Sequence, residues 1–455
     1  MTTASKPGER VDTGPLISEI DFSGRQMRVS TARYSCPDYA ARERDRLWMR
    51  TWQVVGRADA IAEAGDWFEH RLFDQSYILV RGRDSKVRGF VNACRHRGNA
   101  FCEGHGTAAR FTCPYHNWTY DLDGRLLAVA KPDFEGSTEE FVGAKDKLGL
   151  VEVPVESFAG FLFLNPDPEA ESLADFLGEA VELLAPYRVE EMIPYGLHVR
   201  EAIACNWKVV LDAFQEGYHI QGVHPELVAA MDERLERYTF CGDHSVATAP
   251  FGAANLGEAS EGQLIEAIRG LPGTFPAVGD AMPRFEAMLD GLKDGSGAYV
   301  FPDGLTPRLV LQNALRETWV GKGLDVSTLT DNQLTDNHFW ILFPNFFMTI
   351  HAGEATVIIA TPHHDGDPNR CFWEVINLQW FPPEDRATMR AGLVDVPEGE
   401  HFPYFLALEQ DYEQMQHQQR GLRNTRLTEL ALTKQEVRLA HFHAALDSWV
   451  ERSDK

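Results

Sequence analysis

Two short segments, Cys94-Arg-His96-Arg-Gly98 and Cys113-Pro-Tyr-His116, decide how the chain is interpreted. Each segment offers one thiolate and one imidazole, and 16 residues separate His96 from Cys113. Two Cys and two His can bind a tetrahedral zinc ion. Zinc fingers, however, usually pair Cys with Cys and His with His, whereas each segment here provides one of each. That mixed arrangement favours a [2Fe–2S] cluster with two Cys on one iron and two His on the other.

Short β-type runs surround these two segments. Ser76–Arg81 and Gly160–Leu164 are rich in β-branched and aromatic residues, and Gly, Asp and Pro residues separate such runs. Asp123-Gly124 is typical of a tight turn between antiparallel strands. The pattern predicts a small antiparallel β domain over residues 46–168, with a boundary at Asn165-Pro-Asp-Pro168. Cys102 lies between the two segments, but its spacing gives it no ligand role.

The rest of the chain mixes helix-like and strand-like segments. Residues 1–45 indicate an N-terminal arm with a short helix at Tyr39–Met49, packed on the larger domain. Residues 169–455 predict an α+β domain with a central antiparallel sheet. Residues 251–297 are rich in Gly, Ala and Pro with weak periodicity, which indicates a functional flap or a disordered insert. The expected helices are Leu173–Leu184, Trp207–Val223, Asp411–Leu422 and Lys434–Val450, and the expected strands are Phe339–Phe343, Phe346–Ile350, Thr356–Ala360 and Phe372–Trp380.

Composition excludes several classes of protein. The 455 residues carry 43 Lys plus Arg against 68 Asp plus Glu, a formal net charge of −25, which disfavours nucleic acid and anionic membranes as partners. The sequence has no apolar run of about 18 residues, the length that would suggest a transmembrane helix. The polar N-terminus lacks the apolar stretch of a secretory signal, so we expect a cytoplasmic protein. The 7 scattered cysteines form no disulfide framework.

A second group of metal-ligand residue types follows further along the chain. Glu216 and His219 are three positions apart and would share one face of a helix, and His224 follows five positions later. The two histidines can reach one ion only if the helix is distorted, which Gly222 and Pro225 make reasonable. Two His and one carboxylate on one side of a metal leave the other positions open, as in the facial triad of non-haem Fe(II) oxygenases. By itself, however, a His-x₄-His pair is more often a surface or core feature.

The two groups together resemble a known family. The CxHRG…CPYHxWxYxxxG pattern and the NWK…ExYHx₄H run from Asn206 to His224 are similar to the large (alpha) subunit of the aromatic-ring-hydroxylating Rieske non-haem iron oxygenases. The resemblance runs from about Trp52 to Val450 and is weakest over residues 230–335. It implies a helix-grip-like catalytic domain after the Rieske domain. The implied ligands are Cys94 and Cys113 on one cluster iron, His96 and His116 on the other, and His219 and His224 on a mononuclear Fe(II).

The resemblance also implies a third ligand for the mononuclear iron. The segment from Glu409 to Leu422 is similar to the family's ED…QxGL helix, and matching Gln419-Arg-Gly-Leu422 places Asp411 at the ligand position. Glu409 and Glu413 are the competing carboxylates, and a solvated charged helix face is the alternative to any ligand role.

Glu216 takes a different role by the same resemblance. It would bridge a Rieske histidine of one subunit to an iron-ligating histidine of the neighbouring subunit, so that a homotrimer is implied. A carboxylate that accepts hydrogen bonds from two imidazoles orients both of them. One departure is that the family often has Glu-Asn where this chain has Asp212-Ala213, so a role for that Asn is in doubt here.

The function implied is an oxidoreductase that uses O₂ and electrons from NAD(P)H, delivered by a separate ferredoxin or flavin reductase, to hydroxylate a small substrate. We expect an aromatic substrate, as in aromatic hydrocarbon catabolism by mono- or dioxygenation. The alternative within the family is O- or N-demethylation or the oxidation of a quaternary amine. A β subunit is possible but less expected. Alternatives of another class are a Rieske electron carrier or a ligand-sensing protein without oxygenase activity.

Overall fold

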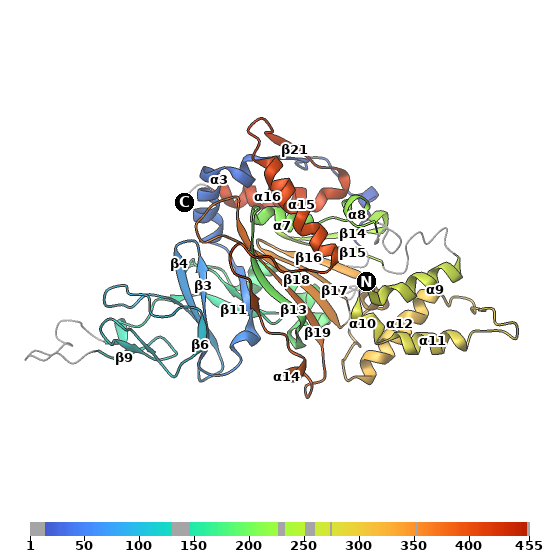
Figure 1. Cartoon of the computed structure of the whole chain (residues 1–455), viewed down its shortest axis with the longest axis horizontal. Coiled ribbons are helices and arrows are strands. Elements are labelled where there is room, and N and C mark those ends of the chain that lie inside the picture. Colours follow the sequence, from blue (N-terminus) through green and yellow to red (C-terminus); the bar gives the residue numbers. More distant parts are fainter. Residues whose placement is uncertain are drawn as a thin grey trace, which may run out of the picture. The chain divides into compact units, whose positions relative to one another are not determined.

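The computed structural model describes residues 14–129, 145–225, 233–250, 260–273, 275–351 and 353–452. The chain divides into two compact units (Figure 1). The small unit comprises Pro37–Phe176, Pro362–Asp367 and Arg452–Lys455, and the large unit comprises Met1–Cys36, Leu177–Thr361 and Pro368–Glu451.

The small unit is built from three antiparallel sheets. A five-stranded sheet has the order β10-β5-β4-β3-β6, and two three-stranded sheets have the orders β11-β12-β2 and β7-β8-β9. The strands predicted at Ser76–Arg81 and Gly160–Leu164 are therefore present. Cys94 and Cys113 belong to the buried cluster of side chains that also contains Phe90, Trp118 and Tyr120. The strands are β2 Gln53–Arg57, β3 Asp66–Leu72, β4 Gln75–Arg81, β5 Val87–Val91, β6 His105–Thr107, β7 Phe111–Thr112, β8 Thr119–Tyr120, β9 Leu126–Ala128, β10 Glu152–Val153, β11 Val155–Phe158 and β12 Phe161–Leu164.

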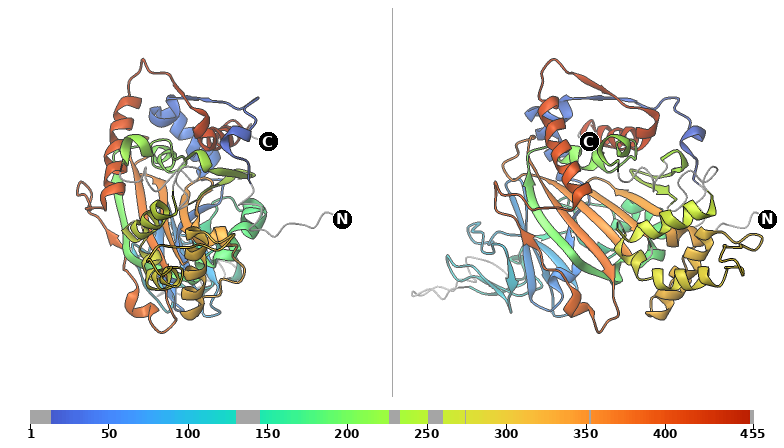
Figure 2. Two further views of the ribbon diagram at one scale, coloured as in Figure 1. Left: turned by 90° about the vertical axis from the view of Figure 1, so that its right-hand side faces the viewer. Right: turned by 45° about the vertical axis from the view of Figure 1, so that its right-hand side comes forward.

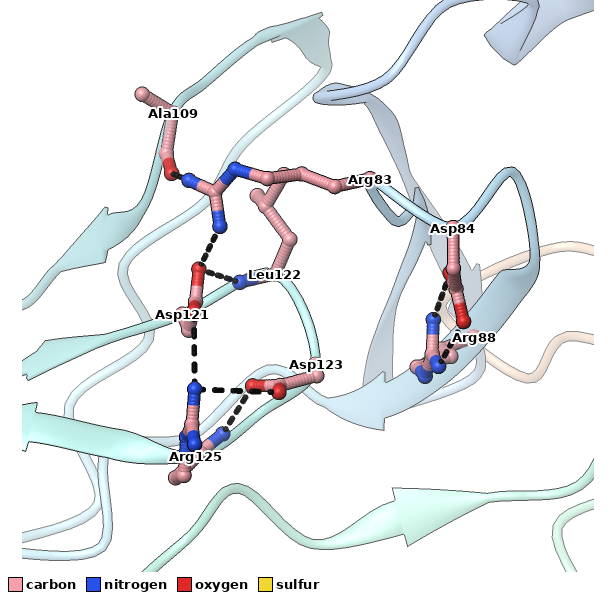
Figure 3. A network of polar contacts seen from close by, with 8 residues as sticks. All are labelled: Arg83, Asp84, Arg88, Ala109, Asp121, Leu122, Asp123 and Arg125. Atoms are coloured by element: carbon pink, nitrogen blue, oxygen red, sulfur yellow. Dashed lines mark hydrogen bonds and ion pairs between the residues drawn. The ribbon is translucent and has the colours of Figure 1, made fainter.

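The β8–β9 turn is held by charged side chains (Figure 3). Gly124 has φ +81°, which only glycine adopts without strain, and a Cβ there would collide with the ring of Phe90. The Asp121 carboxylate accepts hydrogen bonds from the Arg83 guanidinium at 2.5 Å and from the Leu122 N–H at 2.9 Å. The predicted Asp-Gly turn is therefore present.

The helices predicted at Tyr39–Met49 and Leu173–Leu184 differ in the structure. Helix α3 spans Pro37–Glu43 and continues as one π-helical turn over Arg44–Trp48. The expected helix at Leu173–Leu184 is divided into α5 (Leu173–Leu177) and α6 (Ala180–Leu184). The physical reason is Gly178, whose φ of +53° interrupts a right-handed helix.

The large unit is built on one eight-stranded sheet with the order β14-β15-β16-β17-β18-β19-β13-β20. The short edge strand β20 runs parallel to β13, and the other pairs for which a register is resolved are antiparallel. The fold class is thus α+β, as predicted. The strands are β13 Met192–Ile203, β14 Arg237–Cys241, β15 His244–Ala249, β16 Asn337–Leu342, β17 Phe346–His351, β18 Glu354–Pro362, β19 Cys371–Trp380 and β20 Val394–Asp395.

Helices flank this sheet in two groups. Helices α7 (Trp207–Ala213), α15 (Leu406–Leu422) and α16 (Val437–Val450) lie together in Figures 1 and 2. A second group consists of α9 (Glu261–Gly270), α10 (Pro276–Gly279), α11 (Met282–Asp290) and α12 (Pro307–Gly321). No helix in the described part of the chain is both long and apolar enough to cross a membrane.

The expected flap or insert at residues 251–297 is largely helical where the structure describes it. Residues 251–259 and 274 lie outside the described residues. Ser260 caps α9 by accepting a hydrogen bond from the Gln263 N–H, and Gln263 returns a capping contact, which explains how a weakly periodic stretch begins a helix. Phe285 and Leu289 of α11 are fully buried, so the segment packs through a few large side chains.

Helix α15 carries one of the predicted site residues. It begins at Leu406, five residues before the predicted start, and its buried side chains are Leu408, Asp411, Met415, Gln419 and Leu422. This spacing of three and four residues is the inward stripe of a helix, so Asp411 faces the interior together with apolar neighbours. The Gln419 amide oxygen accepts a hydrogen bond from the Asn206 N–H at 3.0 Å, which ties α15 to the residue that caps α7.

Candidate metal centres

The two Cys–His segments form loops with the same backbone hydrogen bonds. The Cys94 N–H donates to the Asn99 carbonyl and the Cys94 carbonyl accepts from the Gly98 N–H. The Cys113 N–H donates to the Trp118 carbonyl and the Cys113 carbonyl accepts from the Asn117 N–H. In both loops the fourth residue after Cys is left-handed, with φ of +73° at Gly98 and +56° at Asn117. The loops are therefore two copies of one local structure, although their sequences differ.

The side chains of these loops fit a two-iron cluster. Cys94 and Cys113 are 3% and 1% exposed, whereas the histidines lie nearer the surface, with the His96 and His116 ring centroids 4.5 Å apart. Two buried thiols beside two outer imidazoles match the distribution of Cys and His over separate irons.

Aromatic side chains enclose the loops. The Trp118 ring stacks on His96 at 5.0 Å, and the Tyr115 ring lies 3.9 Å from His116. Trp118 is 5% exposed and belongs to the hydrophobic core, whereas Tyr115 is 55% exposed. The Tyr120 hydroxyl lies 3.3 Å from Cys94 Sγ, where it can donate to a thiolate. Trp118 thus serves as a core residue and as a cover for His96.

The second site lies where α7 ends. Asn206 caps α7, because its side-chain oxygen accepts a hydrogen bond from the Lys208 N–H at 3.0 Å. The helix ends at Ala213 and a new helix, α8, spans Ile220–Val223. The helix predicted at Trp207–Val223 is therefore interrupted. The prediction that Glu216 and His219 share a helical face is also wrong, since both lie in the non-helical segment between α7 and α8. The distortion that was expected between His219 and His224 lies before His219 instead, in the segment between the two helices.

This break brings the predicted triad together. His224 Nε2 lies 3.0 Å and His219 Nε2 lies 3.8 Å from Asp411 Oδ1. One ligand atom from each of His219, His224 and Asp411 lies within 4.8 Å of the other two. All three donor atoms point to one space, so the donor set fits a metal bound on one face by two imidazoles and one carboxylate.

The competing carboxylates have other partners. Glu409 accepts hydrogen bonds from the His401 ring at 2.7 Å and from the Tyr404 N–H at 3.1 Å. Glu413 is exposed on the opposite side of α15. Asp411 alone of the three predicted carboxylates therefore reaches the two histidines.

Hydrogen bonds from outside the triad orient both imidazoles. His219 Nδ1 donates to Glu216 Oε1 at 2.8 Å, and the His219 N–H donates to Glu216 Oε2 at 2.9 Å. His224 Nδ1 donates to Gln410 Oε1 at 2.8 Å. In each ring the Nε2 atom is thus left to face the metal position. The sequence did not indicate Gln410, because only the tertiary contact between α15 and the end of α8 shows this role.

Charges near His219 favour a cation at this site. Burial alone would lower the pKa of His219, but the carboxylates of Glu216 and Asp411 outweigh it and raise the pKa. The same carboxylates would attract a divalent ion, which would take the place of a proton on Nε2.

A cavity of about 190 Å³ adjoins the triad. Ala213 contributes to its wall where the family often has Asn, so the lost amide leaves an apolar surface there. Asp212, by contrast, is buried at the end of α7 and accepts a hydrogen bond from the Tyr34 hydroxyl at 2.7 Å. Five aromatic side chains line the cavity: Phe214, Phe275, Phe339, Phe347 and Phe405.

Comparison with known proteins decides the family. Residues 51–137 match the family model of the Rieske [2Fe-2S] domain. Residues 184–277 and 305–452, together more than half of the chain, match that of the ring hydroxylating alpha subunit catalytic domain. The chain belongs to the ring-hydroxylating alpha-subunit family. Its members combine a Rieske [2Fe–2S] cluster with a mononuclear iron, in agreement with the two predicted metal centres.

Several curated relatives of this ring-hydroxylating alpha subunit are known. The glycine betaine monooxygenase oxygenase subunit of Chromohalobacter salexigens is 34% identical over 48% of this chain and 49% of its own length. The carnitine monooxygenase oxygenase subunit of Acinetobacter pittii is 30% identical over 50% of this chain and 60% of its own. The chloroplastic choline monooxygenase of Arabidopsis thaliana is 30% identical over 50% of this chain and 56% of its own. The chain thus spans about half of the length of the relatives that it matches.

Solved structures share the fold of this ring-hydroxylating alpha subunit. A quaternary ammonium Rieske monooxygenase in complex with L-carnitine aligns with a TM-score of 0.59 at 17% identity, over 97% of this chain and 99% of that chain. Naphthalene 1,2-dioxygenase from Rhodococcus sp., bound to indole, aligns with a TM-score of 0.63 at 18% identity, over 94% and 95%. These two act on different kinds of molecule, so the likeness establishes the fold alone.

Proposed function

We propose that this chain is the oxygenase component of a Rieske non-haem iron oxygenase, an oxidoreductase that uses O₂. The observation that carries the proposal is the convergence of His219, His224 and Asp411 beside a cavity, in a chain that also has the paired Cys–His loops. The proposed organisation is an N-terminal arm over residues 1–45, a Rieske domain over 46–168 and a catalytic domain over 169–455.

In this proposal Cys94, His96, Cys113 and His116 hold the cluster, and His219, His224 and Asp411 hold the iron. When bound, the cluster supplies single electrons and the iron supplies O₂ activation. The chain itself orients the imidazoles of His219 and His224 through Glu216 and Gln410, which accept their Nδ1 protons.

The cavity wall supports a cationic substrate. Phe214 and Phe347 lie with ring centroids 5.2 Å apart, and Phe339 lies 6.5 Å from Phe347. The carboxylates of Glu216, Glu236 and Asp411 also line the cavity. Aromatic faces and nearby carboxylates both attract a quaternary ammonium group. The three relatives described above are named for glycine betaine, carnitine and choline. We therefore propose a monooxygenase of a quaternary amine, and the aromatic substrate that we expected from sequence has less support.

The proposed assembly follows from the family resemblance. We propose a homotrimer in which Glu216 links the Rieske histidines of one subunit to His219 of its neighbour, with electrons from NAD(P)H delivered by a separate reductase or ferredoxin. Light scattering on the purified protein tests the trimer. A monomer that turns over with a full electron-transfer chain would contradict the proposed role of Glu216 between subunits.

The decisive experiment is electron paramagnetic resonance on anaerobically purified, iron-replete protein, reduced with dithionite and then exposed to nitric oxide. A Rieske-type signal together with a high-spin iron–nitrosyl signal is expected. Separate samples without dithionite and nitric oxide should consume O₂ on addition of a quaternary amine when NAD(P)H and a reductase supply the electrons. A Rieske signal without the nitrosyl signal would favour the electron carrier or the sensor. Uptake with arenes and not with quaternary amines would restore the aromatic alternative.

A further inference from the structure

A second cavity adjoins the one at the triad. Its volume is about 540 Å³, larger than the inner cavity of about 190 Å³. The two share part of their walls, because six residues line both. They are Phe275, Asn337, Thr349, Thr356, Phe405 and Ala407. We call the cavity at the triad the inner chamber and the second cavity the outer chamber.

One face of the β17–β18 hairpin forms a common wall for both chambers. Side chains two residues apart share a face of a strand, and the register pairs Phe347 with Ile358, Thr349 with Thr356 and His351 with Glu354. The first pair lines the inner chamber, the second lines both and the third lines the outer chamber. From Phe347 to His351 the strand advances about 13 Å at 3.3 Å per residue.

The three pairs change in chemistry along this wall. The inner pair is apolar. The hydroxyls of the middle pair donate to fixed amides, from Thr349 to Asn337 Oδ1 at 2.6 Å and from Thr356 to Asn377 Oδ1 at 3.0 Å. The outer pair is ionisable. A ligand that lies along the wall therefore meets aromatic carbon near the triad and ionisable groups at its far end.

The outer pair is buried and offers acceptors. His351 Nε2 lies 2.7 Å from Glu354 Oε1, and the Ala277 N–H donates to Glu354 Oε2 at 2.6 Å. The side chains of His351 and Glu354 are 9% and 13% exposed. With Nε2–H donating to the carboxylate, His351 Nδ1 and the remaining carboxylate lone pairs can only accept.

Positive groups are missing from the same wall. Among the described residues that line the outer chamber there is no lysine and no arginine. These residues therefore offer no cationic partner for a carboxylate group, and a second negative charge near Glu354 would be repelled in a partly desolvated space.

We propose that the outer chamber is a second recognition site, in which Glu354, held by His351 and Ala277, binds a protonated amine at the far end of an elongated substrate. The proposal deepens the proposed function, on which it rests for the oxidised end at the triad. In this proposal Glu354 is a specificity-determining residue, and the outer chamber selects against substrates that end in a carboxylate.

The titration of the pair agrees with this role. Burial raises the pKa of Glu354 to about 7, and burial lowers the pKa of His351 to about 4. Near neutral pH the carboxyl group of Glu354 is therefore partly protonated, and the neutral imidazole of His351 supplies no cation that would hold it ionised. A bound ammonium would supply the missing charge.

The test measures binding to the holoprotein under anaerobic conditions by calorimetry. The probes are trimethylammonium compounds with linear alkyl chains that end in an amino, a methyl, a hydroxyl or a carboxylate group, compared at several chain lengths. We expect the amino probe to bind at least tenfold more tightly than the methyl probe of the same length, and the carboxylate probe to bind most weakly. A preference for the hydroxyl or carboxylate probe would overturn the proposal.

The matched variants are Glu354→Gln, which keeps the shape and the acceptor for Ala277, and Glu384→Gln on the exposed surface. Glu354→Gln should lose the preference for the amino probe and leave the methyl probe unchanged, whereas Glu384→Gln should change neither. Equal losses for all probes, or no change for the amino probe, would overturn the proposal. The nitrosyl signal of the same samples keeps the two ideas apart, because its absence would count against the oxygenase and not against the binding preference.

Discussion

The two metal centres are built in opposite ways. The four cluster residues lie between Cys94 and His116, on two loops with the same hydrogen bonds. The three residues of the triad come from two segments, and His224 and Asp411 are 187 positions apart. The cluster site is thus mostly local structure, whereas the triad exists only when α15 packs beside the break between α7 and α8.

This difference has a consequence for how each centre fails. A loop that carries its own hydrogen bonds tolerates changes elsewhere, but it depends on each Cys. A site assembled by packing depends on a carboxylate that arrives from a distant helix. Substitutions in the two regions should therefore remove different numbers of iron atoms from the same protein.

The largest effect is expected for Cys113→Ser. The substitution removes a buried thiol that we propose as a cluster ligand, so the cluster and its two irons should be lost, together with turnover. The small unit should also unfold more easily, because Cys113 lies in its core. Iron analysis and visible absorption measure the loss. Cys102→Ser is the matched control, since Cys102 is half-buried and has no ligand role, and should keep the cluster.

Asp411→Ala should remove the third iron and leave the cluster intact. The two histidines alone bind iron weakly, so we expect turnover to fall by more than about 100-fold, in line with the loss of a metal ligand. The exposed Glu413 on the same helix is the control, and Glu413→Ala should retain three irons. Iron content and the nitrosyl signal distinguish the two variants. If Asp411→Ala kept the nitrosyl signal, the ligand assignment would have to move to another carboxylate.

Glu216→Gln should give a smaller effect of a different kind. The glutamine oxygen can still accept the His219 Nδ1 proton, so iron should remain, but the negative charge and the acceptor for the His219 N–H are lost. We expect turnover to fall by about 10- to 100-fold, the range found for groups that orient metal ligands. The reoxidation of the pre-reduced cluster, followed by stopped flow, should slow by the same factor.

Gln410→Ala provides the comparison for Glu216→Gln, because it removes the hydrogen bond to His224 and leaves Glu216 in place. It should weaken iron binding and leave cluster reoxidation unchanged in iron-loaded protein. Equal effects of both variants on reoxidation would reduce Glu216 to an orienting residue and contradict its proposed part in electron transfer.

The same contrast explains what could be predicted from the sequence. The Cys–His pattern indicated the cluster because its ligands and turns are local. The strands around it and the α+β class followed from alternation and turn residues. The break at Phe214 was not predicted. The role of Gln410 was not predicted either, because its hydrogen bond to His224 depends on the packing of α15. The assignment of Asp411 came from resemblance, and only the tertiary structure separates it from Glu409 and Glu413. The outer chamber was not predicted, since His351 and Glu354 become meaningful only in the register of β17 and β18.

The smallest effect expected concerns the equivalence of the two cluster loops. Gly98 and Asn117 hold the same left-handed position, and a Cβ at Gly98 would meet no atom within 4 Å. Gly98→Ala should therefore cost only the conformational penalty, about 1 kcal/mol in the free energy of unfolding. Gly98→Asn should cost less, because Asn tolerates this backbone conformation, as the other loop illustrates. Urea titrations of both variants, followed by cluster absorption, measure the difference. If Gly98→Asn lowered the free energy of unfolding as much as Gly98→Ala, the two loops would share their hydrogen bonds but not the cost of the left-handed backbone at this position. A further contact in the second loop would then have to stabilise Asn117 in that conformation.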